Sequence, residues 1–261
     1  MAPYSKIVTG TDGSEAACDA ITVTGVIAAA TGIPVAVVTA WKSSVAVPGG
    51  REQPWADLTA RGADVDLTAM GVTTIKQFPL QGNAFDALVR IANRSSHALI
   101  VVGAAGLDQT SSRLLGSTSN QLSHNSPVDV LFVRRPVQKF TSVALATDGS
   151  PTSLRAVRAG VDLAAAVGAR PVLVTAAGDT ASGTATLTDV ADQLDTAELE
   201  HRILLGSPAD ALISTADNYD LLVIGNRGMS GFARVLGSTA NTITHRATSN
   251  LLLVNTAPAA G

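Results

Sequence analysis

The 261-residue sequence consists of two similar halves that carry the same motifs. Its fold must therefore contain two copies of one structural unit. Thr-Asp-Gly-Ser occurs at residues 11–14 and again at residues 147–150, which is 136 positions later. Two further pairs follow in the same order: QGNAFDAL at 81–88 with LGSPADAL at 205–212, and ALIVVGAAG at 98–106 with DLLVIGNRG at 220–228. Segments with similar residues that occur in the same order along the chain indicate two copies of one fold.

The two copies, called repeat 1 and repeat 2, differ in length. Gly82 and Gly206 are only 124 positions apart, so repeat 1 has about a dozen extra residues between Trp41 and Gly82. That region includes VPGGREQPW at residues 47–55, which its composition predicts to be a loop. The junction lies near RRPVQKF, and the predicted domains are residues 1–137 and 138–261.

Each repeat alternates apolar runs with helical segments. Ser14 and Ser150 are predicted helix N-caps, and Gly32 and Gly168 are predicted to end those helices. In repeat 2 we expect strands at 143–147, 171–175, 199–204, 221–224 and 251–254, and helices at 187–197 and after Ser207-Pro208. Strands and helices that alternate at this spacing predict an α/β fold, with an open parallel sheet in each repeat and helices on both faces.

Composition and charge exclude several classes of function. A net charge of −3 and an aromatic content of 3% leave no basic surface and no stacking platform, so no nucleic-acid partner is expected. The longest apolar runs are about five to ten residues, too short to span a membrane, and the first residues lack a signal-peptide core. We therefore expect a cytoplasmic protein. No metal-ligand spacing or catalytic motif is present, so neither a metal site nor a catalytic residue is predicted.

Two loops in each repeat follow predicted strands and have the residue types of a ligand site. Gly225 and Gly228 would let main-chain N–H groups approach an anion, and Gly237-Ser238-Thr239 is predicted to open a helix, where phosphate is favoured. Asp148 suits a ribose hydroxyl or a base amino group, because a carboxylate repels phosphate. The alternative is that Asp12 and Asp148 only cap the first helix of each repeat and that the glycines only form tight turns.

With these motifs, the chain resembles a tandem universal stress protein. The resemblance implies two domains of the adenine nucleotide alpha hydrolase-like fold, with strand order 3-2-1-4-5. It also implies ATP binding through Gly-x2-Gly-x9-Gly-[Ser/Thr], an Asp after the first strand and a backbone contact to adenine from the second strand. In repeat 1 the implied site residues are Asp12, Ala40, Val102, Gly103, Ala105, Gly106, Gly116, Ser117 and Thr118. In repeat 2 they are Asp148, Ala176, Ile224, Gly225, Arg227, Gly228, Gly237, Ser238 and Thr239.

Both repeats depart from the family motif in one respect. Repeat 2 has eight residues, not nine, between Gly228 and Gly237, which alters the geometry around the phosphates. Repeat 1 has Ala105 where the family often has a polar donor, whereas repeat 2 has the cationic Arg227 at that position. We expect both repeats to bind ATP, with Arg227 favouring repeat 2.

The predicted function is a stress-response protein that binds ATP, expected with Mg²⁺, as a regulatory ligand without efficient catalysis. Two alternatives stay open at this point: a nucleotide-free interaction scaffold and a slow ATPase. The resemblance also implies that the last strands, DVLFV and NLLLV, pair within the chain as a pseudo-dimer of the repeats. Two chains can then associate further as a homodimer.

Overall fold

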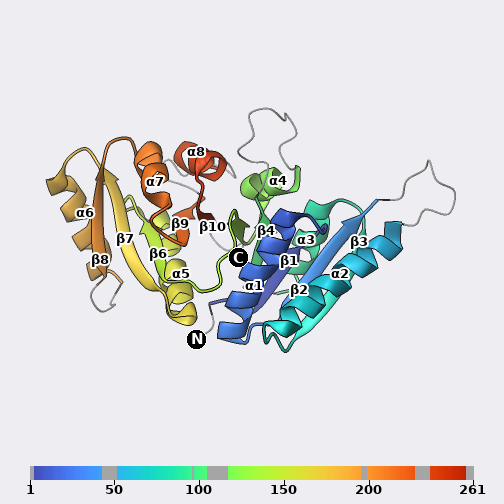
Figure 1. Ribbon diagram of the computed structural model, residues 1–261. Helices are drawn as coiled ribbons and strands as arrows, with labels where there is room; N and C mark the ends of the chain where they lie inside the picture. The colour runs from blue at the N-terminus through green and yellow to red at the C-terminus, as the bar shows by residue number, and fades with distance from the viewer. Residues whose placement is uncertain are drawn as a thin grey trace.

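Ten strands form one continuous sheet in the part of the chain that the computed structural model describes, residues 3–42, 52–95, 97–104, 117–194, 199–226 and 236–256 (Figure 1). In repeat 1 the strands are β1 (Lys6–Gly10), β2 (Val35–Trp41), β3 (Ile75–Gln81), β4 (Ala98–Gly103) and β5 (Asp129–Val133). In repeat 2 they are β6 (Ser142–Ala146), β7 (Arg170–Ala177), β8 (Glu200–Leu205), β9 (Leu221–Gly225) and β10 (Asn250–Val254).

Helices separate the strands, as the alternating pattern predicts. Repeat 1 contains α1 (Glu15–Thr31), α2 (Glu52–Ala69), α3 (Ala84–Ala92) and α4 (Ser117–Asn125). Repeat 2 contains α5 (Pro151–Val167), α6 (Thr180–Asp192), α7 (Pro208–Ala216) and α8 (Ser238–Arg246). None of the described helices is both long enough and apolar enough to cross a membrane.

The strand order is β3-β2-β1-β4-β5-β10-β9-β6-β7-β8, which is 3-2-1-4-5 in each repeat, as expected. Neighbouring strands run parallel within each repeat, and β5 pairs antiparallel with β10. Leu131 lies opposite Leu252, and each is the third residue of its five-residue strand. The pairing is therefore symmetric about this leucine pair, and the intrachain pseudo-dimer is confirmed.

The predicted helix boundaries agree with the structure where capping residues determine them. The Ser14 and Ser150 side chains accept hydrogen bonds from the N–H groups of Ala17 and Ser153 at 3.3 and 3.2 Å. Gly32 and Gly168 end these helices in the left-handed conformation, with φ of 70° and 68°, which glycine adopts without strain.

Two of the predicted boundaries are wrong. The helix expected at 187–197 is α6, which begins at Thr180 because Asp179 caps it by accepting from the Ser182 N–H at 2.8 Å. Residues 195–197 lie outside the described part. The stretch at 47–55 is predicted to be a loop, but its described residues from Glu52 onward form the first turn of α2. Pro54 is compatible with this turn, because the N–H groups of the first turn have no partner within the helix. The extra residues of repeat 1 therefore include helix.

Each face of the sheet has an apolar core that extends through both repeats. Helices α1, α2, α5 and α6 cover one face, and α3, α4, α7 and α8 cover the other. The central strands are buried on both sides, as the continuous apolar run Leu221–Ile224 illustrates. Strands with both faces covered in this way are typical of parallel sheets.

Two side chains link the repeats at the ends of the antiparallel pair. Asn250, the first residue of β10, accepts hydrogen bonds from the backbone N–H groups of Arg134 and Arg135 at 2.9 and 3.2 Å. Asp129, the first residue of β5, accepts from the Asn255 N–H at 2.8 Å and from the Tyr4 hydroxyl at 2.9 Å. The two links are equivalent by symmetry, but one uses an amide and the other a carboxylate.

We expect Asn250→Ala to lower the free energy of unfolding by about 2 kcal/mol, because two N–H donors at this junction lose their acceptor. Urea denaturation of the full chain measures this change. Asn125→Ala, at the exposed end of α4, is the control and should change the free energy by less than about 0.5 kcal/mol. Equal effects of the two substitutions would contradict the role assigned to Asn250.

Burial raises the pKa of Asp129 above its ordinary value, despite the hydrogen bonds from Asn255 and Tyr4, which act to lower it. The folded state therefore holds a proton more tightly than the unfolded state does, so stability falls as pH rises from 3.8 through the folded pKa. We expect the free energy of unfolding of the wild type, relative to Asp129→Asn, to decrease across this window. A difference that is constant with pH would contradict the shift.

Candidate functional site

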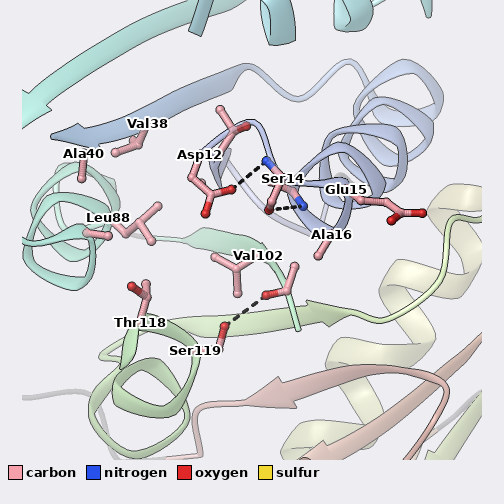
Figure 2. A pocket seen from close by; sticks show the side chains of 15 residues that line it. Asp12, Ser14, Glu15, Ala16, Val38, Ala40, Leu88, Val102, Thr118 and Ser119 are labelled. Atoms are coloured by element: carbon pink, nitrogen blue, oxygen red, sulfur yellow. Dashed lines mark hydrogen bonds between the residues drawn. The ribbon is translucent and has the colours of Figure 1, made fainter. Parts of the chain in front are cut away.

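In repeat 1 the carboxyl ends of β1, β2 and β4 open into a cavity of about 580 Å³ (Figure 2). Five predicted site residues line it: Asp12, Ala40, Val102, Gly103 and Thr118. The other lining residues are Gly10, Thr11, Ser14, Glu15, Ala16, Ala17, Val38, Ala84, Leu88 and Ser119. Because β1 pairs with both β2 and β4, the sheet brings together loops that are far apart in the sequence.

The repeated Thr-Asp-Gly-Ser forms a tight turn between β1 and α1. Thr11 Oγ1 accepts from the Gly13 N–H at 3.2 Å, and Asp12 Oδ1 accepts from the Ser14 N–H at 3.0 Å. Gly13 has a φ of 78°, which explains why the motif needs glycine there. The turn therefore uses one of the two carboxylate oxygens of Asp12. The other oxygen has no hydrogen-bond partner among the described residues, and the side chain faces the cavity (Figure 2).

The cavity wall is apolar in its middle part and polar at two places, the turn before α1 and the start of α4 (Figure 2). Val38, Ala40, Leu88 and Val102 supply the apolar surface. One polar part lies at the start of α4, where the first N–H groups of a helix lack partners within the helix.

Thr118 and Ser119 belong to this polar part of the wall. The Ser119 hydroxyl donates to the Gly103 carbonyl at 3.1 Å, which joins the start of α4 to the end of β4. Among the described lining residues, the charged ones are Asp12 and Glu15, both acidic. A ligand with negative charge is therefore favoured only near α4, away from these carboxylates.

Gly103 has a packing role that sequence analysis did not reveal. A Cβ atom built on Gly103 would overlap the backbone carbonyl of Ala16, in the first turn of α1. The glycine therefore allows the end of β4 to lie against α1. This requirement exists whether or not a ligand binds.

Repeat 2 has the same arrangement of elements around its predicted residues. Asp148 Oδ1 accepts from the Ser150 N–H at 3.0 Å, and Gly149 has a φ of 78°, so the turn of repeat 1 is reproduced. Gly237 caps α8, and its N–H donates to the Asn226 carbonyl at 3.0 Å, which brings the start of α8 to the end of β9.

The remaining predicted residues of repeat 2 lie on the elements assigned to them. Ala176 is on β7, Ile224 and Gly225 are on β9, and Ser238 and Thr239 are exposed at the start of α8.

Part of the predicted glycine loops lies outside the described residues. This applies to Ala105, Gly106 and Gly116 in repeat 1 and to Arg227 and Gly228 in repeat 2. Ser117 begins α4, but its side chain is also outside the description. Their roles in phosphate binding stay predictions.

Sequence reasoning missed the contribution of the helices to the cavity wall. Ala84 and Leu88 come from α3, and Glu15 comes from α1. The available signal for α3 was the repeated segment QGNAFDAL, which contains both residues and to which no site role was assigned. No group of three or more His, Cys, Asp or Glu side chains in the described ranges is arranged to hold a metal ion.

The model of the universal stress protein family matches the chain twice, at residues 3–134 and 139–255. The chain belongs to this family. The universal stress protein Rv1636 of Mycobacterium tuberculosis H37Rv is 30% identical over 149 residues, which cover 51% of this chain and 98% of that protein. The two family matches fit two tandem domains in one chain.

Solved structures with the same fold can be superposed on nearly the whole chain. A universal stress protein of Archaeoglobus fulgidus DSM 4304 has a TM-score of 0.73 at 19% identity, covering 97% of this chain and 99% of that chain. The functionally unknown protein PA1789 of Pseudomonas aeruginosa PAO1 has a TM-score of 0.67 at 14% identity, covering 97% and 92%. At these identities the likeness establishes the universal stress protein fold and nothing more.

We expect Gly103→Ala to destabilise the protein by about 1–3 kcal/mol, because the added methyl group meets the rigid backbone of α1. Thermal and urea denaturation without any added ligand measure the change. Gly178→Ala is the matched control, since a Cβ atom there meets nothing within 4 Å. If Gly103→Ala were as stable as the control, the glycine would not be required for packing.

Proposed function

We propose that this universal stress protein binds ATP in each repeat as a regulatory ligand, without efficient catalysis. The observation that supports this most is the cavity of about 580 Å³ in repeat 1, where five predicted residues from four separate elements converge: the turn after β1, strands β2 and β4, and helix α4. Cavities that bind small ligands are commonly 300–1,000 Å³, largely apolar, and supplied with a few polar groups. The repeat 1 cavity has these properties.

Each part of ATP matches a different part of the cavity wall. The apolar surface around Ala40, Leu88 and Val102 suits adenine. The oxygen of Asp12 that the turn leaves without a partner suits a ribose hydroxyl. The start of α4, with Thr118, suits the phosphates, because helix N-termini favour anions. Mg²⁺ would reduce the repulsion between the phosphates and the two carboxylates in the wall.

Repeat 2 supports the same proposal through its duplicated turn and the exposed start of α8. Asp148 lies in the turn that follows β6. Ser238 is the first residue of α8, whose start is joined to the end of β9 by the hydrogen bond from the Gly237 N–H to the Asn226 carbonyl. Because β6 pairs with β9, the turn and the start of α8 lie at the ends of neighbouring strands. We propose that a second ATP binds between the turn after β6 and the start of α8.

Hydrolysis is not favoured by the described side chains. Asp12 already accepts from the Ser14 N–H and lies at the sugar end of the proposed pose, so it is badly placed to activate water at the terminal phosphate. ATP would therefore act by binding, and the cytoplasm, where ATP is abundant, is the proposed location.

We expect Asp12→Ala and Asp148→Ala each to remove about one ATP per chain, since a hydrogen bond to a charged group contributes about 1.5–3 kcal/mol and its loss weakens binding 10- to 100-fold. Calorimetry with ATP, AMP and cAMP measures the affinity and the number of sites per chain. Chromatography of the nucleotide released on denaturation measures how many of these sites are occupied in the purified protein. Asp192→Ala, exposed at the end of α6, is the control. Asp12→Asn retains the acceptor for Ser14 and separates loss of charge from loss of the turn.

Three outcomes would change the proposal. Wild-type protein that neither releases nor binds an adenine nucleotide would indicate the interaction scaffold instead. Steady-state phosphate release that Gly237→Val abolishes would indicate an ATPase. Tight binding of AMP or cAMP, with no gain from further phosphates, would show that the start of α4 does not bind them.

A further inference from the structure

The outward face of α2 has large apolar side chains that the fold does not bury. Among the described residues four large apolar side chains are exposed, and three of them lie on α2: Trp55 at 44%, Leu58 at 69% and Val65 at 68%. The opposite face of α2 is fully packed, with Ala56, Ala60 and Leu67 at 0% exposure. The exposed side chains are therefore additional to the core.

The duplication provides an internal control for this observation. Helix α6 occupies in repeat 2 the place that α2 occupies in repeat 1, at the opposite end of the sheet (Figure 1). Its exposed residues are small or polar, including Ala181, Ser182, Thr184, Ala185 and Thr188. Because the same fold forms in repeat 2 without large apolar groups there, packing within the domain does not require them in repeat 1.

The exposed residues follow one stripe along α2. Trp55, Leu58, Gly62 and Val65 recur at intervals of three and four, which places them on one side of a helix. Gly62 interrupts the stripe with a notch, since a Cβ atom built there meets nothing within 4 Å. The notch borders a cavity of about 200 Å³ between α1 and α2, so there is room for an incoming side chain.

We propose that this stripe, residues 55, 58, 62 and 65 of α2, is a self-association surface for a second copy of the chain. If two α2 helices pack antiparallel about residue 60, each Leu58 lies opposite the Gly62 notch of the other copy. Each Trp55 then lies opposite Val65. The antiparallel helix dipoles also favour this orientation. The surface is self-complementary, as a twofold dimer requires.

The association is weak, because one helix from each copy buries less surface than a stable interface needs. Charge alone opposes it, since the described side chains of α2 include Asp57, Asp64 and Asp66 but only one cation, Arg61. Apolar contact must therefore supply the free energy. We expect a dissociation constant on the order of 10 µM.

Sedimentation velocity of the full chain across a concentration series tests the proposal. We expect a reversible dimer that Leu58→Asp weakens at least tenfold, whereas the matched control Ala185→Asp, on the exposed face of α6, leaves it unchanged. Gly62→Gln fills the notch and should weaken association at least tenfold while raising the denaturation midpoint, because glycine is a poor helix former. A substitution that merely damaged the fold would lower the denaturation midpoint, so weaker association together with a higher midpoint would point to the surface itself.

Two results would overturn the proposal. The first is a monomer throughout the concentration series. The second is a dimer whose affinity is the same in the wild type, Leu58→Asp and Gly62→Gln, because it would form through another surface. Neither result depends on ATP, so the outcome is independent of the nucleotide experiments.

Discussion

The antiparallel pairing of β5 with β10 determines the form of the whole molecule. A five-stranded parallel sheet with order 3-2-1-4-5 leaves its last strand with unpaired backbone groups, which can pair with another strand. Here the partner is the same strand of the other repeat, so Leu131 and Leu252 meet at the centre of a ten-stranded sheet. The apolar cores above and below the sheet then continue from one repeat into the other.

Much of the fold could be predicted from the sequence, because local chemistry determines it. The serine caps, the glycines that end helices and the apolar runs each favour one local conformation, and the caps and end glycines occur in both repeats. The start of α6 was missed because Asp179 caps a helix rich in Ser and Thr, which lacks a clear apolar period. The first turn of α2 was missed because Pro54 suggests a loop, although proline fits the beginning of a helix.

The candidate site was less predictable than the fold. Asp12 and Gly103 were singled out because of their residue types, and both line the cavity. However, each residue also has a structural role: Asp12 stabilises the turn before α1, and Gly103 allows β4 to pack against Ala16. The sequence alone could not distinguish these roles from ligand binding. Leu88 was missed because an apolar residue on a helix face has the same pattern whether it borders a core or a ligand.

The two links at the centre of the sheet show what a fused chain permits that a pair of identical subunits does not. In a dimer of identical subunits, any substitution beside the twofold axis occurs twice, and so does its energetic effect. In this chain the link in repeat 1 uses Asp129 and the link in repeat 2 uses Asn250. A single buried carboxylate is therefore accommodated at one end only. Tandem fusion thus lets the two halves of one interface carry different residues, Asp129 at one end and Asn250 at the other.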